Sequence, residues 1–497
     1  MFRVREVKTK VGSHSIQVVR YVNGKRIIVK HIGTGSTTEE LVLLREAAGK
    51  FIEEVSHQAA LSFNLKASEN DVSLAHCVYQ GFRYNFLYEV ISGLQDRLGY
   101  RSAADQMLND LVVMRILEPV SKLRSIELMK TYFGINHRRQ RYYESALSWL
   151  RLKDQIESKT LQFAKATYGF DFSLLFYDVT TLYFETFESD DLRKTGFSKD
   201  SKSQQPQILV GLMVTKEGFP VSYGVFPGNT FEGHTMLPMI RSFIDRHQAK
   251  HFTVVADAAM ISTSNISALQ SAGVHYIVGA RLGNVTNRIF QQIDKGLIRE
   301  DGETIRLQTE NGFLVCGFSM QRYKKDKYEM EKQIAKAKLL LKTPSRNSKI
   351  KFLKTEGAKL TLHDELISKT EKLLGIKGYY TDLPKSVADN NMIMDRYHDL
   401  YKVEQAFRIS KTDLQTRPIF HFKEEPIKLH LLICFMALAI SKQIEITTEV
   451  SIRAFITECK KVTDAIMIHK PTQKEISLRA QISPNFKDIV SKLARPH

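Results

Sequence analysis

The stretch SLLFYDVTTLYFE, residues 173–185, decides how this chain folds. Its apolar and β-branched residues are typical of a buried strand. Asp178 directly follows the apolar run, so its carboxylate is expected at the carboxyl end of that strand. Because removing an unpaired carboxylate from water costs several kcal/mol, we expect Asp178 to face a cationic partner.

Two further segments carry carboxylates in comparable positions. HFTVVADAAM, residues 251–260, places Asp257 directly after another apolar run. YHDLYKVEQAFRISKTDL, residues 397–414, is predicted to be a helix that carries Glu404. A lone aspartate at the end of a strand more often caps a helix or joins a surface ion pair. Three carboxylates together, however, would form a cage of oxygen ligands for hard divalent cations.

The predicted helix has a polar stripe beside an apolar one. At about 100° per residue, the polar stripe consists of Tyr397, Tyr401, Glu404, Arg408 and Lys411. The apolar stripe consists of Leu400, Val403 and Phe407. Such a polar stripe could be a solvated ladder of ion pairs, which is common on surface helices. The apolar stripe favours a helix that packs on the core, with the polar stripe at the seam.

The order of elements around the aspartates predicts the fold class. Three consecutive strands are expected over residues 172–179, 206–215 and 220–228, with a hairpin turn at residues 216–218. The pattern then alternates: a helix, the strand ending at Asp257, a second helix and a second strand, over residues 235–281. Three antiparallel strands followed by strands alternating with helices predict an α/β fold with an RNase H-like catalytic core.

The remaining segments divide the chain into further expected domains. Residues 1–60 read as a small module of a hairpin around Asn23-Gly24 and a helix, and residues 84–167 as helices that could bind DNA or serve as a helical support. The core would cover residues 171–281 and resume at 379–445 with the Glu404 helix. Residues 282–378 are too many for an ordinary connection and predict a strand-rich inserted subdomain. Residues 446–497 would form a C-terminal helical tail.

Composition points to a polyanionic partner. The 497 residues contain 72 Lys and Arg against 54 Asp and Glu, which gives a formal net charge of +18. The excess is spread along the chain, so a folded basic surface is expected, and nucleic acid is the usual partner of such a surface. The partner expected for this chain is double-stranded DNA. A basic chain without a polyanionic partner is the alternative. In a strongly basic protein, the carboxylate cage points to cutting or joining phosphodiester bonds.

Cysteine usage and hydropathy indicate the compartment. The four cysteines share no metal-ligand spacing and no disulfide framework, which fits a reducing interior. The N-terminus has no apolar run typical of a signal peptide, and the longest apolar run, residues 429–440, is too short to cross a bilayer. We therefore expect a cytoplasmic, nucleoid-associated protein without membrane contact.

The Glu404 segment also resembles a known family. The spacing of Tyr397, Glu404 and Lys411 resembles the Y-(2)-R-(3)-E-(6)-K signature of the IS-four superfamily of DDE insertion-sequence transposases, which are mobile-element enzymes. In this chain the signature arginine falls at Leu400. Arg408, one turn beyond Glu404 on the same predicted face, could supply a guanidinium instead.

Other segments are similar to the same superfamily. They include both aspartate stretches, residues 196–235 between them, and residues 417–439, so that the resemblance covers about residues 100–445. The resemblance implies a transposase in which Asp178, Asp257 and Glu404 hold two Mg²⁺ ions, for which Mn²⁺ can substitute. It also implies cleavage at the element's ends and attack of the freed 3′-OH on target DNA. Tyr397, Arg408 and Lys411 would contact phosphates near the scissile bond.

Further basic residues are candidates for DNA contact. Lys199 and Lys202 lie in a polar loop next to the first aspartate stretch and could bind DNA, or belong to a solvated hairpin loop. His234 could contact DNA or be a satisfied histidine at a helix N-terminus. Because two element ends must be joined to one target, we expect a dimer in the synaptic complex. The alternatives are a catalytically inactive DNA-binding protein derived from a transposase, and an RNase H-like nuclease that does not transpose.

Overall fold

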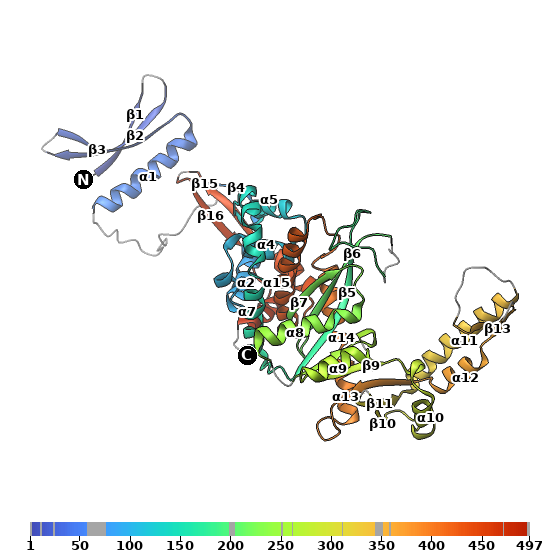
Figure 1. Ribbon diagram of the computed structural model, residues 1–497. Helices are drawn as coiled ribbons and strands as arrows, with labels where there is room; N and C mark the ends of the chain where they lie inside the picture. Colours follow the sequence, from blue (N-terminus) through green and yellow to red (C-terminus); the bar gives the residue numbers. More distant parts are fainter. Residues whose placement is uncertain are drawn as a thin grey trace. The chain divides into compact units, whose positions relative to one another are not determined.

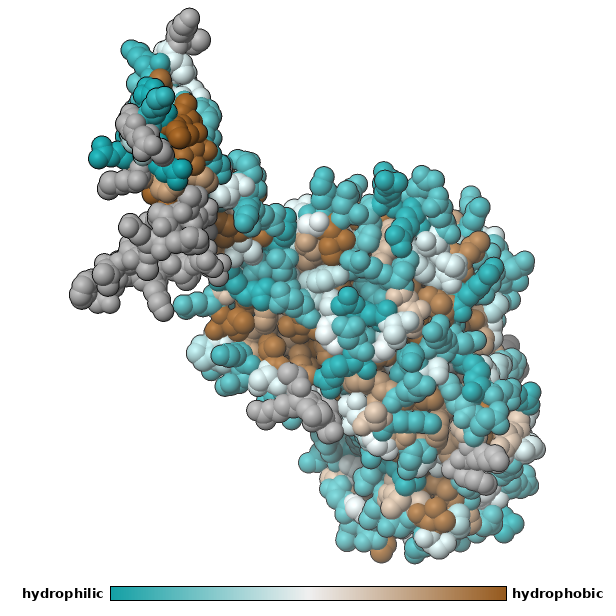
Figure 2. All heavy atoms as spheres, turned by 90° about the vertical axis from the view of Figure 1, so that its left-hand side faces the viewer, coloured by the Kyte–Doolittle hydropathy of each residue, from teal (hydrophilic) through white to brown (hydrophobic). Residues whose placement is uncertain are grey.

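The computed structural model divides into two compact units. It describes residues 2–9, 12–22, 25–56, 76–197, 204–249, 252–260, 262–310, 312–342, 351–356, 359–470 and 472–494. The first unit, called here the N-terminal unit, comprises Met1–Phe82 with Asp464–Arg479, and the second, the main unit, comprises Arg83–Thr463 with Ala480–His497. Figure 2 shows a surface on which hydrophilic residues dominate and hydrophobic residues form separate patches.

The N-terminal unit contains two small sheets. In the first, β1 (Phe2–Lys8), β2 (His14–Val22) and β3 (Lys25–Gly35) pair in sequence order, and α1 (Thr38–Ser56) packs against them. Val22 lies opposite Lys25, as the predicted two-residue hairpin requires, although Asn23 and Gly24 themselves lie outside the described residues. In the second sheet, β15 (Asp464–His469) pairs with both β4 (Cys77–Arg83) and β16 (Lys474–Arg479). The C-terminal tail is therefore not wholly helical, although α16 (Ile452–Lys461) and α17 (Pro484–Ala494) belong to it.

The main unit is built on an eight-stranded mixed sheet, ordered β10-β11-β14-β9-β8-β5-β6-β7. Its first strands are β5 (Leu174–Tyr183), β6 (Gln207–Val214) and β7 (Pro220–Pro227), which pair antiparallel in sequence order. They are followed by β8 (Thr253–Ala256) and β9 (His275–Ala280), which are parallel to β5. The predicted α/β fold with an RNase H-like core is confirmed. The helices α8 (Met236–His247) and α9 (Thr263–Ser271) connect β7, β8 and β9, as expected.

Part of the predicted insertion extends this sheet. β14 (Ile376–Thr381) pairs antiparallel with β9, β11 (Gly312–Phe318) with β14, and β10 (Thr304–Thr309) with β11. An edge strand exposes a row of unpaired backbone N–H and C=O groups. Without the insertion β9 would be such an edge, and β14 pairs with its backbone groups instead. The other inserted elements are α10 (Asn287–Gly296), α11 (Met320–Lys342), β12 (Leu353–Glu356), β13 (Lys359–Leu362) and α12 (Asp364–Lys372).

The helices of residues 84–167 share a core with the sheet. They are α2 (Asn85–Arg97), α3 (Tyr100–Ala103), α4 (Gln106–Leu117), α5 (Lys122–Phe133), α6 (Arg139–Leu150) and α7 (Lys153–Tyr168). The central helix α15 (Glu424–Thr448) packs against α4, α6 and β7, and Figure 1 shows α4 and α15 side by side. By length and composition α15 could cross a membrane, but 89% of its most apolar window is buried inside the protein. It is a core helix in this structure.

Candidate active site

The two aspartates are neighbours in the sheet. β5 and β8 pair in parallel up to Tyr177 opposite Ala256, so Asp178 and Asp257 form the next position of the register. Residues at equivalent positions of adjacent parallel strands point to the same face. Asp178 does not end its strand as predicted, because β5 continues to Tyr183 along β6. It is β8 that ends here, at Ala256, directly before Asp257. Both carboxylates therefore lie where the parallel pairing of β5 and β8 ends, at its carboxyl side.

Tyr397 fixes the second aspartate. Its hydroxyl donates a hydrogen bond of 3.2 Å to Asp257 Oδ1, and the backbone N–H of Ala258 donates to the same oxygen at 2.7 Å. The tyrosine comes from α13 (Asn390–His398), which packs across β8, β9 and β14. Burial raises the pKa of Tyr397, and the negative charges of Asp257 and Asp178 raise it further, so the hydroxyl remains a donor.

A glycine makes room for this contact. A Cβ atom at Gly279 of β9 would lie 2.5 Å from the hydroxyl oxygen of Tyr397, which is closer than real Cβ contacts. Any side chain at this position would push Tyr397 away from Asp257. The Tyr397 ring also packs on Tyr379 of β14, with 4.7 Å between the ring centroids.

Lys377 is a member of the site that the sequence analysis missed. It lies on β14, and its Nζ stands 4.7 Å from the centre of the Tyr397 ring. Burial lowers the pKa of Lys377 and so does the charge of Arg322, whereas Asp257 and Glu404 act in the opposite direction. Lys377 is thus within electrostatic reach of two of the three predicted carboxylates. The only signal in the sequence was a lysine within an otherwise apolar strand.

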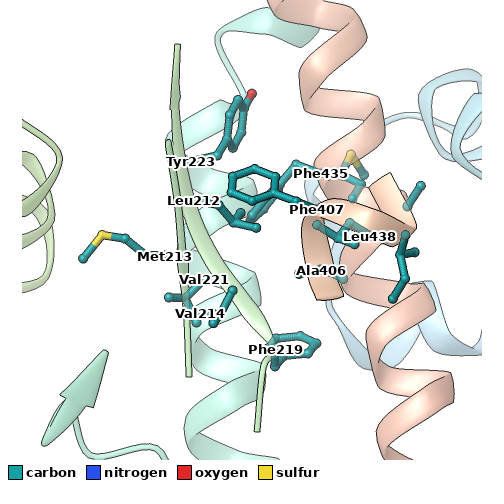
Figure 3. Close-up of a cluster of buried hydrophobic side chains, with 14 of the residues drawn as sticks. Leu212, Met213, Val214, Phe219, Val221, Tyr223, Ala406, Phe407, Phe435 and Leu438 are labelled. Carbon is teal, nitrogen blue, oxygen red and sulfur yellow. The ribbon is translucent and has the colours of Figure 1, made fainter. Parts of the chain in front are cut away.

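Glu404 does not form a compact group with the two aspartates, although it acts on the pKa of Lys377 together with Asp257. It lies in the first turn of α14 (Tyr401–Thr412), which packs against β5, β6 and α15. Figure 3 shows Ala406 and Phe407 of α14 in an apolar cluster with side chains of the sheet and of α15. Glu404 itself is exposed. Among the described residues, no three His, Cys, Asp or Glu side chains lie close enough to hold a metal ion.

The single helix predicted over residues 397–414 is divided between two helices in the structure. α13 ends at His398 and α14 begins at Tyr401, so Tyr397 and Glu404 belong to different helices. Between them the Leu400 N–H bonds to the Tyr397 carbonyl, and the Val403 N–H to the Leu400 carbonyl, which is tighter than α-helical spacing. Leu400 is 5% exposed. The continuous polar stripe is therefore broken: Tyr397 is buried, whereas Glu404 is exposed.

The predicted basic residues have different surroundings. Arg408 is exposed, and its charge is among the causes, after burial, that lower the pKa of Lys442. Lys411 is half-buried and lines a small cavity of about 30 Å³ between the sheet and α15. Lys199 and Lys202 lie outside the described residues. His234 lies in the short helix η2 (Glu232–His234), with its ring 5.5 Å from that of Phe231.

A charged cleft opens next to Asp257. It has a volume of about 600 Å³ and is lined by Asp257, Lys377 and Tyr397 on the side of the sheet. The helix α11 of the insertion contributes Arg322 and Glu329 to its lining. The insertion and Asp257 therefore share one open, polar cavity, large enough to admit part of a bound polymer.

Comparison with known proteins identifies the family. A sequence model described as "Transposase DDE domain" matches residues 170–440, which is more than half of the chain. The chain belongs to this transposase family. The matched transposase domain runs from the segment before β5 into α15 and contains Asp178, Asp257 and Glu404.

Solved structures add little to this assignment. A cryo-EM structure of the piggyBac transposase synaptic complex with hairpin DNA has 12% identity and a TM-score of 0.36, and the match covers 76% of this chain and 70% of that one. The Mos1 transposase paired-end complex with the left transposon end has 10% identity and a TM-score of 0.16, with 46% and 66% covered. No curated protein matches the transposase chain significantly.

Proposed function

We propose that this transposase belongs to the IS-four superfamily, cleaves DNA at the ends of its element, and transfers the freed 3′ ends into target DNA. The observation that carries the chemistry is the adjacent placement of Asp178 and Asp257 at the end of the parallel strand pair. The family match supports the class of enzyme. The net charge of +18 supports DNA as the partner, because Lys and Arg neutralise phosphates on binding.

The donor set suits Mg²⁺. Both hydrogen bonds to Asp257 reach Oδ1, so that its Oδ2 meets no hydrogen-bond donor among the described residues. Hard divalent cations prefer such carboxylate oxygens. Asp178, Asp257 and Glu404 would hold two ions, and Mn²⁺ would substitute. When bound, the metal would activate water or a 3′-OH and stabilise the leaving oxygen.

The protein's own side chains would prepare this site. Tyr397 orients Asp257 through its hydroxyl, and we assign it a positioning role in place of the predicted phosphate contact. Lys377 would offset part of the carboxylate charge before metal binds. Glu404 would approach the aspartate pair when DNA is bound, since the exposed face of α14 leaves its side chain free of packing.

DNA would be held by the basic residues that the sequence singles out. Arg408 and Lys411 on α14, with Lys199 and Lys202, would contact phosphates. Two element ends require two active sites, so two protomers would assemble in the synaptic complex. The enzyme would act in the cytoplasm, where the nucleoid provides its DNA.

The test is Asp178→Asn, with Asp191→Asn as the matched control. Asp191 is fully exposed in the loop after β5, and its contact with Lys194 is 3.9 Å long. With a plasmid that carries the element and its flanking DNA, Asp178→Asn should lose Mg²⁺-dependent cleavage and retain DNA affinity, and it should bind less Mn²⁺ by electron paramagnetic resonance. Asp191→Asn should match the wild type in all three assays. Full cleavage by Asp178→Asn would refute the proposal.

A second candidate function is DNA binding without cleavage. It is favoured by the absence of a compact group of three metal-binding side chains in the described part of the chain. The same plasmid assay separates the possibilities. Binding by the wild type without any cleavage would indicate an inactive derivative, and cleavage without joining to target DNA would indicate a non-transposing nuclease.

A further inference from the structure

A second polar cavity lies in the helical part of the main unit. It has a volume of about 100 Å³ and is lined by Arg115 from α4, Ser121 and Lys122 at the start of α5, and His430 from α15. Phe420, which is 68% exposed, also lines this cavity, so it reaches the surface. None of these residues has a part in the proposed catalytic site.

The cavity contains two buried basic side chains that have no carboxylate partner among the described residues. Arg115 is 5% exposed and Lys122 is 4% exposed. The guanidinium of Arg115 donates a hydrogen bond of 2.9 Å to the carbonyl of Val120, and the ammonium of Lys122 lies 2.9 Å from His430 Nδ1. In the described part of the chain, neither cation forms an ion pair with a carboxylate. Buried charges are normally paired, because desolvating them is costly.

The hydrogen bonds of His430 define how Lys122 is held. His430 Nε2 lies 3.0 Å from the carbonyl oxygen of Thr416, which can only accept. Nε2 therefore carries the proton, and Nδ1 accepts from the Lys122 ammonium. An ammonium has three N–H donors. His430 uses one of them, and the other two have no partner among the described residues.

Positive charges dominate the electrostatic surroundings, and only Cys434, whose Sγ lies 3.6 Å from His430 Nε2, acts on the pKa of Lys122 in the opposite direction. Burial lowers the pKa of Lys122, and the charge of Arg115 lowers it further. Burial and the same two cations lower the pKa of His430, and they lower that of His421 to about 4. The N-terminus of the 12-residue helix α5, which Ser121 caps, adds the partial positive charge of the helix dipole. A bound anion would offset the mutual repulsion of these basic groups, and the helix N-terminus adds to its attraction.

We propose that this cavity binds one phosphate group, supplied either by the backbone of bound DNA or as inorganic phosphate. A cavity of about 100 Å³ suits a single tetrahedral oxyanion. Arg115 offers guanidinium donors, which match phosphate oxygens well, and Lys122 offers a point charge. The inference does not depend on the proposed cleavage chemistry, since it concerns other residues, but its DNA source rests on the proposed DNA partner.

The first experiment measures thermal stability of the full chain in inorganic phosphate. At constant ionic strength, replacing chloride with phosphate should raise the Tm of the wild type by a few degrees, and the rise should follow the logarithm of phosphate concentration. Lys122→Met should unfold at the same or a higher Tm without phosphate, because a buried unpaired charge is removed, and should lose the phosphate response. Arg115→Met should lose the response too.

The matched control is Lys130→Met, which removes one charge from an exposed position of the same helix. It should keep the full phosphate response. A second arm distinguishes the source of the phosphate by titrating duplex DNA in chloride buffers of increasing salt. If a backbone phosphate occupies the cavity, Lys122→Met should lower the slope of log K against log salt by about 0.9 relative to the wild type.

The outcomes are distinct. A phosphate response with an unchanged slope assigns the cavity to inorganic phosphate, and a reduced slope assigns it to DNA. A wild-type Tm that ignores phosphate, together with identical DNA slopes for Lys122→Met and Lys130→Met, would overturn the proposal. Failure of the catalytic assignment would leave this result unaffected.

Discussion

Replacing Tyr397 with Phe removes only the hydroxyl oxygen from the candidate active site. The change tests whether this hydroxyl orients Asp257 or contacts a DNA phosphate. The hydroxyl donates at 3.2 Å to Asp257, while the ring keeps its packing on Tyr379 and its contact with Lys377. A hydrogen bond from a neutral donor to a charged acceptor contributes about 1.5–3 kcal/mol. Because Asp257 is exposed and the bond is long, we expect the lower end of this range.

About 1.4 kcal/mol corresponds to roughly a tenfold change in an equilibrium constant. In a cleavage assay on the plasmid-borne element, Tyr397→Phe should therefore need about ten times more Mg²⁺ for half-maximal rate, and should approach the wild-type rate at saturating Mg²⁺. Its DNA affinity and the salt dependence of that affinity should not change.

The control is Tyr380→Phe, which makes the same change on the neighbouring strand β14 without touching a carboxylate. It should leave the Mg²⁺ requirement unaltered. If Tyr397→Phe instead weakens DNA binding and lowers its salt dependence, the hydroxyl contacts a phosphate and the positioning role is refuted. A loss of rate that no Mg²⁺ concentration restores would refute it as well.

Two further predictions follow from the same structure. Gly279→Ala would place a Cβ 2.5 Å from the hydroxyl oxygen of Tyr397, so it should destabilise the main unit by about 1–3 kcal/mol in urea unfolding and raise the Mg²⁺ requirement; unchanged values for both would contradict the packing described. The pKa of His421 is lowered to about 4 by burial and the charges of Lys122 and Arg115. The unfolded chain therefore binds a proton at His421 near pH 6.5, whereas the folded protein binds it only near pH 4. As a result, the free energy of unfolding should be highest above pH 6.5 and should fall as the pH drops toward 4. His421→Gln should flatten this loss in phosphate-free buffer, as measured by unfolding between pH 7 and 4, and an unchanged pH profile would refute the shift.

The fold of the catalytic core could be predicted because its signals are local. Three apolar runs follow one another without a predicted helix between them, which favours neighbouring antiparallel strands, and the helices on either side of β8 make it parallel to β5. The register then brings Asp178 and Asp257 together. For these strands, the pattern of apolar residues along a short segment was enough to predict their order and the adjacent placement of the two aspartates.

Other features depend on contacts that periodicity does not encode. The pairing of β15 with β4 joins segments almost at opposite ends of the chain, and β11 and β14 find each other across α11 and α12. The burial of Leu400 interrupts what reads as a continuous helix. Lys377 enters the site through strand pairing at the far side of β9. Each case is decided by tertiary packing, which overrides the local pattern.

The extension of the sheet by β10 and β11 limits how this protein could be shortened. The segment between β11 and β14 lies outside the ladder, so removing β12, β13 and α12 would leave every strand of the central sheet paired. Removing β10 and β11 would instead leave β14, whose residues are mostly buried, as a bare edge beside the strands that carry the aspartates. Such edges recruit strands from other molecules. A trimmed enzyme that keeps this hairpin should stay soluble, whereas one that lacks it should aggregate.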